Sequence, residues 1–160
     1  MEERLTHVST RDPLFSHDGI HDSQTHLAAP QFFYEQLRRQ IALAIRNQIC
    51  FCLIKITFTK LPLHGQLTPV SADDILHFSF ELKKLTRTED CIGRLGINEC
   101  VILLADGELS ARQLISRLYA TPSLYVNNSL HIAISMVTSH SNETGLDLLK
   151  RLDYAPLSTH

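Results

Sequence analysis

The sequence lacks three features that would point to particular partners. Its 160 residues carry 15 Lys and Arg against 17 Asp and Glu, so no basic excess exists to hold a nucleic acid through counterion release. No apolar run approaches the roughly 18 to 20 residues that a membrane helix requires. The first residues contain no apolar stretch that could act as a signal peptide. We therefore expect a cytoplasmic protein that neither binds nucleic acid nor inserts into a membrane.

Cysteine is scarce, and its spacing does not match the usual metal motifs. The four cysteines, Cys50, Cys52, Cys91 and Cys100, include no Cys-x-x-Cys pair, and the nine histidines show no His-x-x-x-His spacing within a predicted helix. All four cysteines lie in apolar stretches that favour strands, so we expect small buried side chains. A thiol metal site is the alternative, because Cys50 and Cys52 would share one face of a strand. We expect no metal and no cofactor.

Hydrophobic periodicity divides the chain into an arm and one domain. Residues 1–25 are polar and carry turn signals, which predicts a flexible arm before a domain at 26–157. The expected order is helix, strand, helix, strand, strand, helix, strand, helix. Helices are predicted from Pro30 and over 72–86, 109–120 and 143–153, and strands over 49–57, 91–95, 100–105 and 130–138. This order predicts an α+β domain with a central mixed sheet flanked by helices, the plan of ferredoxin-like domains.

The segment around the predicted hairpin resembles a known family. Residues 87–100 read Arg-Thr-Glu-Asp-Cys-Ile-Gly-Arg-Leu-Gly-Ile-Asn-Glu-Cys, which is similar to the hairpin of GGDEF domains, the diguanylate cyclases that condense two GTP into cyclic di-GMP. The motifs Asp-x-x-Thr-x-Leu at 22–27 and Leu-Leu-x-x-Leu-Asp at 148–153 follow the family in order and spacing. The resemblance implies a GGDEF, nucleotide-cyclase-like fold with a five-stranded type of sheet.

The resemblance also implies that the catalytic positions are degenerate. Family cyclases use a Gly-Gly turn followed by an acidic metal ligand, and here these positions are Gly96, Ile97 and Asn98, while the next acid is retained as Glu99. A second metal-binding carboxylate of the family lies on the first strand, where this chain has Lys55. A β-branched residue resists the positive φ of such a turn, and an ammonium group repels a divalent cation. We expect no cyclase activity.

A different family site has its residues in place. Many GGDEF domains carry Arg-x-x-Asp just before the hairpin, where the product binds and inhibits, and Arg87 and Asp90 occupy that register. A guanidinium can bind phosphate and stack on guanine, while a carboxylate accepts the paired N–H groups of the guanine edge. Arg117 is the candidate for the family's secondary arginine. Asp73 matches the acid that contacts guanine in the substrate site.

Three functions follow from this sequence. The leading hypothesis is a catalytically inactive domain that binds cyclic di-GMP through Arg87 and Asp90 and passes this signal to a protein partner. The second is a protein interaction or dimerisation module that binds no nucleotide, in which case Arg87 and Asp90 form a solvated ion pair at a helix end. The third is a residual enzyme, which either binds GTP without turnover or carries out a changed chemistry at Lys55 and Glu99.

Overall fold

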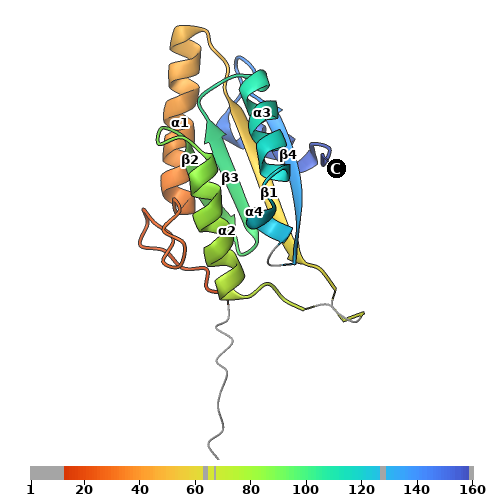
Figure 1. The fold of residues 1–160 in the computed structure, drawn as a ribbon. Helices are drawn as coiled ribbons and strands as arrows, with labels where there is room; N and C mark the ends of the chain where they lie inside the picture. Colours follow the sequence, from red (N-terminus) through yellow and green to blue (C-terminus); the bar gives the residue numbers. More distant parts are fainter. Residues whose placement is uncertain (1–12, 63–64, 67, 127–128, 159–160) are drawn as a thin grey trace, which may run out of the picture.

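A four-stranded sheet forms the centre of the fold (Figure 1). The structure is a computed structural model that describes residues 13–62, 65–66, 68–126 and 129–158. Its elements in chain order are α1 (Pro30–Asn47), β1 (Cys52–Lys60), α2 (Ala72–Leu85), β2 (Cys91–Gly96), β3 (Glu99–Leu104), α3 (Glu108–Tyr119), α4 (Pro122–Tyr125), β4 (Leu130–Thr138) and α5 (Gly145–Tyr154). The predicted order of helices and strands is confirmed, with the short α4 as an addition. None of the described helices is long and apolar enough to cross a membrane.

The strand order is β2-β3-β1-β4, and every pair of neighbouring strands is antiparallel. The predicted α+β fold with a central sheet flanked by helices is confirmed, but the described sheet has four antiparallel strands instead of the mixed, five-stranded type expected. Helical crossovers do join parallel strands, β1 to β2 and β3 to β4, but in each case an antiparallel strand lies between the two. The parallel pairing that the structure describes is an isolated bridge between Ala28 and Gly93, on the outer edge of β2.

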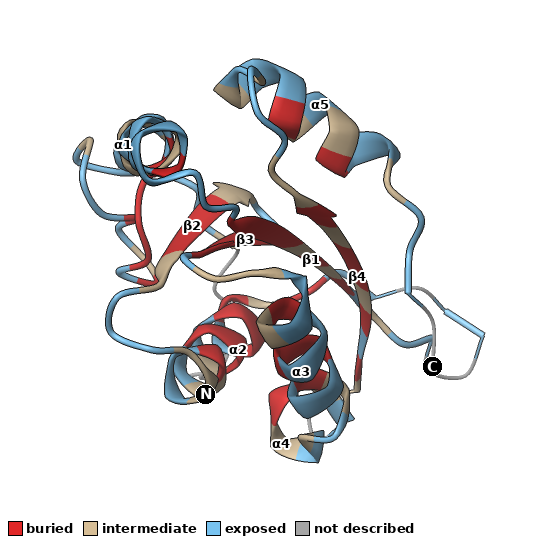
Figure 2. Cartoon of the chain, turned by 90° about the horizontal axis from the view of Figure 1, so that it is seen from above, coloured by how far each residue is buried: buried red, intermediate tan, exposed pale blue. Residues whose placement is uncertain are grey.

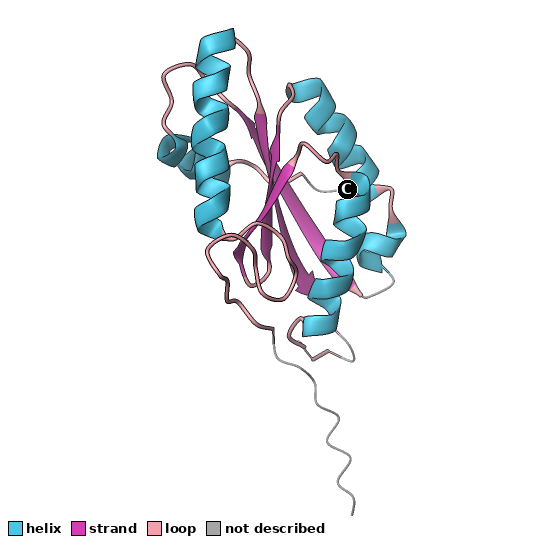
Figure 3. Cartoon of the chain, turned by 90° about the vertical axis from the view of Figure 1, so that its left-hand side faces the viewer, coloured by secondary structure: helices cyan, strands magenta, loops and turns pink. Residues whose placement is uncertain are grey.

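Helices cover both faces of the sheet, so the fold has three layers (Figures 2 and 3). One face packs against α2, α3 and α4, and the other packs against α1 and α5. Alternate residues of β1 serve the two cores because successive side chains of a strand point to opposite faces. Thus Ile54, Ile56 and Phe58 belong to the first core, and Leu53 belongs to the second, together with Phe51 just before the strand.

Local sequence explains how the helices begin and how closely one of them packs. Pro30 occupies the first turn of α1, where its missing N–H would have no helical partner. Ser71 and Asp74 form a reciprocal capping box at the start of α2. Gly93 in β2 lets α1 approach closely, because a Cβ at this position would lie 2.6 Å from the ring of Phe33.

The structure differs from the sequence prediction at the chain start and at the first strand. The sequence predicts a flexible arm over 1–25. Residues 1–12 lie outside the described residues, but Asp22 and Thr25 are buried in the fold. The first strand begins at Cys52, three residues later than predicted, because Gln48 ends α1 in the left-handed conformation. Cys50 precedes the strand and is exposed, which corrects the prediction that every cysteine is buried.

Candidate functional site

The resemblance implies that the turn between β2 and β3 corresponds to the family's substrate turn. None of its residues has a positive φ, as expected when Ile97 replaces glycine. Hydrogen bonds fix its backbone, because Nη2 of Arg94 donates to the carbonyl of Ile97 over 3.1 Å and the Phe58 N–H donates to the carbonyl of Asn98 over 3.1 Å. The side-chain Oδ1 of Asn98 is buried without a hydrogen-bond partner among the described residues.

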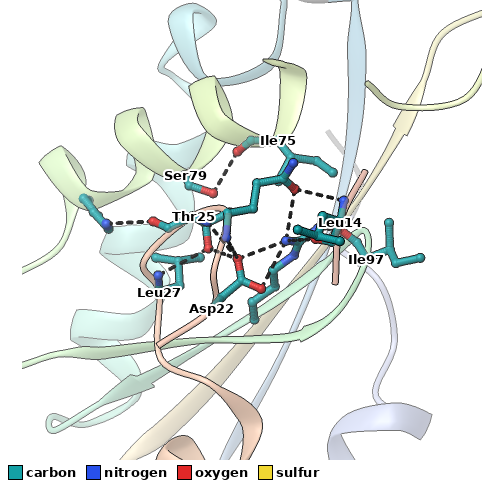
Figure 4. A network of polar contacts seen from close by, with 10 residues as sticks. Leu14, Asp22, Thr25, Leu27, Ile75, Ser79 and Ile97 are labelled. Carbon is teal, nitrogen blue, oxygen red and sulfur yellow. Dashed lines mark hydrogen bonds and ion pairs between the residues drawn. The ribbon is translucent and has the colours of Figure 1, made fainter. Parts of the chain in front are cut away.

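A buried ion pair ties this turn to the segment before α1 (Figure 4). The Arg94 and Asp22 side chains are each 1% exposed, and their closest atoms are 3.0 Å apart. Nη1 of Arg94 also donates to the Leu14 carbonyl and to the side chain of Gln24. The Asp22 carboxylate accepts from the N–H and the hydroxyl of Thr25 over 2.8 and 2.7 Å. These contacts attach the segment 14–25 to the hairpin formed by β2 and β3.

The lysine on β1 pairs with an acid of α5. Lys55 pairs across the sheet with Val101 and Ser135, whereas Thr57 is the residue opposite Glu99 at the turn. The Lys55 ammonium donates to the Asp153 carboxylate of α5 over 3.0 Å, and the Lys55 side chain is only 14% exposed. Where the family resemblance implies a metal-binding carboxylate, this chain therefore has a cation already paired with an acid.

The acids at the start of α2 have different surroundings. Asp73 is exposed, and Asp74 is buried beside Lys60, whose ammonium donates to its carboxylate over 2.9 Å. Burial opposes ionisation of Asp74, but hydrogen bonds from Ser71 and Lys60 outweigh that effect and lower the pKa of this carboxyl. Glu99 is half-buried at the start of β3. Within the described residues, no three His, Cys, Asp or Glu side chains gather in a way that could hold a metal ion.

Arg87 and Asp90 form a closed turn between α2 and β2. The Arg87 N–H donates to the Asp90 carboxylate over 3.0 Å, and the Asp90 N–H donates to the Arg87 carbonyl over 3.1 Å. Burial raises the pKa of the Asp90 carboxyl. The Arg87 guanidinium is 60% exposed and lies 3.7 Å from the Asp106 carboxylate, a contact of the surface type that contributes at most about 1 kcal/mol. The guanidinium can therefore turn toward a ligand at little cost.

Both residues line one cavity of about 550 Å³. One wall contains residues of the α2–β2 connection, and the opposite wall comes from α1 and the segment before it. Besides Arg87 and Asp90, the polar residues that line it are His21, His26, Gln36, Lys83, Thr86, Thr88 and Glu89. A cavity of this size, with an aromatic ring and several charged groups, falls in the range of small-ligand sites.

Arg117 does not line this cavity. It lies in the last turn of α3, while Asp106, the partner of Arg87, lies just before the first turn of the same helix. The helix rises 1.5 Å per residue, so these two ends are about 16 Å apart. Within one chain, the structure does not bring Arg117 to the Arg87 and Asp90 turn, and the role predicted for Arg117 has no geometric support.

Comparisons with known proteins establish the family of this chain and its fold. The family model described as "Diguanylate cyclase, GGDEF domain" matches residues 19–157, so the chain belongs to the GGDEF family. Among solved structures, the GGDEF domain of DgcB from Caulobacter crescentus in complex with cyclic di-GMP has a TM-score of 0.71 and 16% identity, with 88% of this chain and 87% of that chain covered. A microbial GGDEF domain studied for its interaction with cyclic di-GMP gives 0.71 and 18%, with 84% and 86% covered.

A third structure shows a relative with a protein partner. The diguanylate cyclase SiaD from Pseudomonas aeruginosa, in complex with its activator SiaC, has a TM-score of 0.69 and 19% identity, and the match covers 84% of this chain and 55% of that chain. This chain thus spans about half of SiaD. A search of curated protein sequences finds no significant match. At these identities the structures establish the fold and no more.

Sequence reasoning missed the pairing of Asp22 with Arg94 and the α1 wall of the cavity. Arg94 did carry a signal, because a charged residue inside an apolar strand is rarely buried without a partner. Nothing in the sequence identifies that partner, since Asp22 lies 72 residues earlier. The cavity wall has no comparable signal, because it joins residues from three separate segments.

Proposed function

We propose that this GGDEF domain is catalytically inactive and binds cyclic di-GMP at the turn formed by Arg87 and Asp90. The observation that carries the proposal is the contrast between the two sites. Arg87 and Asp90 line one open cavity, whereas the lysine at the position of the family's metal ligand is paired with Asp153. Cyclic di-GMP offers two phosphates and two guanines, which suit a guanidinium and a carboxylate placed side by side.

The absence of turnover follows from charge and from backbone geometry. Phosphoryl transfer between two nucleotides relies on divalent metal ions held by carboxylates among the phosphates. This chain offers Lys55 and the neutral Asn98 at the two positions in question, and Ile97 closes the turn where the family has glycine. Replacing Asn98 alone by Asp therefore still leaves a lysine at the position of the strand carboxylate, and activity should not return.

Two measurements test this function. Purified protein incubated with GTP and Mg²⁺ or Mn²⁺ should form no cyclic di-GMP above a control without protein. Isothermal titration with cyclic di-GMP should give a Kd of micromolar order, about −8 kcal/mol. Arg87→Ala should weaken binding by about 10- to 150-fold, and Asp90→Ala by a similar factor, because each removes a charge-assisted contact.

The control variants lie in the degenerate substrate site. Substitution of Asn98 or Lys55 should leave the affinity for cyclic di-GMP nearly unchanged. No heat up to about a hundred times the expected Kd would overturn the receptor function. Formation of cyclic di-GMP from GTP would overturn the inactive state.

One observation favours the second candidate, a protein interaction module. A cavity of about 690 Å³ between α1 and α5 is lined mainly by apolar side chains, among them Tyr34, Ile41, Leu146 and Leu149. Tyr34 and Leu146 are 46% and 63% exposed. Exposed apolar surface of this kind is typical of docking sites for proteins, including a second copy of the same chain. Sedimentation of the purified chain with and without cyclic di-GMP separates a dimer from a monomer.

A further inference from the structure

The cavity that contains Arg87 and Asp90 has a second wall that the family resemblance did not indicate. Phe32 and Gln36 come from the first turns of α1, and His21 and His26 come from the segment before it. Phe32 is 36% exposed although it is a large aromatic residue in a helix. The ring therefore borders the cavity and is not enclosed in the core.

Arg87 and Asp90 alone leave half of the ligand without partners. Cyclic di-GMP has two phosphates and two guanines, and one guanidinium and one carboxylate can serve only one of each. Arg117, the sequence-based candidate for the remaining contacts, lies at the other end of α3 and does not line the cavity. The remaining contacts must come from groups that do line it.

We propose that Phe32 is the stacking platform for a guanine and that His21 and His26 bind the second phosphate. This inference rests on the proposed function, because it completes the same site. Every nucleobase offers a π face to an aromatic ring, and an imidazolium donates from both of its nitrogens. His26 has a φ of 57°, which is the left-handed backbone conformation. The two residues that follow it, Leu27 and Ala28, are buried. The turn fixes the backbone from which this imidazole extends.

Charged groups of both signs surround the two imidazoles. The cations that line the cavity are Lys83 and Arg87, and the acids are Glu89 and Asp90. The Asp18 carboxylate lies beside the backbone of His21, because it accepts from the backbone N–H of that residue over 2.8 Å. Burial raises the pKa of the Cys91 thiol to about 11, so this thiol stays neutral.

The test is isothermal titration of the full chain with cyclic di-GMP. Phe32→Leu keeps the apolar volume but removes the π face, so binding should weaken by about 5- to 150-fold. Leu43→Ala changes an exposed apolar residue of α1 outside the cavity and should leave the Kd unchanged, as should Arg117→Ala. The double variant His21→Gln, His26→Gln removes both imidazoles and should weaken binding by about 5-fold or more.

The outcomes separate this inference from the function on which it rests. If the wild type binds and Arg87→Ala abolishes binding, while Phe32→Leu and the double histidine variant bind like wild type, the inference is overturned and the proposed function stands. If the wild type does not bind at all, both fail. Loss of affinity in the Phe32 and histidine variants as well as in Arg87→Ala, with Leu43→Ala unchanged, supports the inference. Circular dichroism of each variant shows that the loss does not come from unfolding.

Discussion

Replacement of Asp22 by alanine should destabilise this domain more than any change to a surface ion pair. The variant leaves the Arg94 guanidinium buried without its counter-charge, since both side chains are 1% exposed. Removing one partner of a buried pair typically costs about 3 to 5 kcal/mol. With a urea m-value of about 2 kcal/mol/M, the unfolding midpoint should fall by roughly 1.5 to 2.5 M.

A matched surface variant calibrates this measurement. Glu35→Ala breaks the pairs with Arg38 and Arg39, whose side chains are 76% and 69% exposed, and should cost no more than about 1 kcal/mol. If Asp22→Ala proves too unstable to purify, Thr25→Val removes one hydrogen bond to the same carboxylate and should cost about 1 kcal/mol. A midpoint for Asp22→Ala within the range of Glu35→Ala would refute the reasoning about burial.

Three further predictions concern single residues. Gly93→Ala should lower the free energy of unfolding, measured in urea, by about 1 to 3 kcal/mol, because the new Cβ would lie 2.6 Å from the Phe33 ring of α1. As a control, Gly145→Ala meets only ordinary contacts and should be neutral or stabilising. Asp90→Asn should stabilise the unliganded protein at pH 7, because the folded-state pKa of Asp90 is raised and its ionised form therefore costs stability. This gain should disappear below about pH 4, where the carboxyl is protonated in both the folded and the unfolded state. A loss of stability at pH 7 would contradict the direction of this pKa shift. Iodoacetamide at pH 8 should label the exposed Cys50 first and Cys100 only on unfolding, since burial raises the pKa of the Cys100 thiol to about 12. Labelling of both cysteines at the same rate in the folded protein would contradict the burial of Cys100.

The sequence was sufficient for the elements of the fold but not for their arrangement. Periodicity located β4 over 130–138 as observed, and it placed α2 and α3 within one residue at each end. It could not show that each helical crossover spans an intervening antiparallel strand, because strand neighbours depend on contacts between distant segments. The polar residues around Asp22 led to the prediction that this segment lies in solvent. That prediction was wrong because the partner of the Asp22 carboxylate in the fold is Arg94, which lies on a distant element.

The candidate site shows the same division. Arg87 and Asp90 are three residues apart, so their closeness in the structure follows from the sequence, whereas their binding role stays a prediction. The position of Arg117 depends on which end of α3 faces the turn, and residue order does not reveal it. Phe32 and the two histidines join the cavity only because α1 packs beside β2, where Gly93 admits it.

The central claim is that cyclic di-GMP binds beside Arg87 and Asp90, away from the former substrate turn. Amide chemical shifts of the 18.1 kDa protein, recorded during titration with cyclic di-GMP, test it most directly. We predict that the shifts of residues 86–92 and of the first turns of α1 change with a common Kd, while those of residues 96–99 stay constant. Changes centred on residues 96–99, or no change at millimolar ligand, would contradict the account.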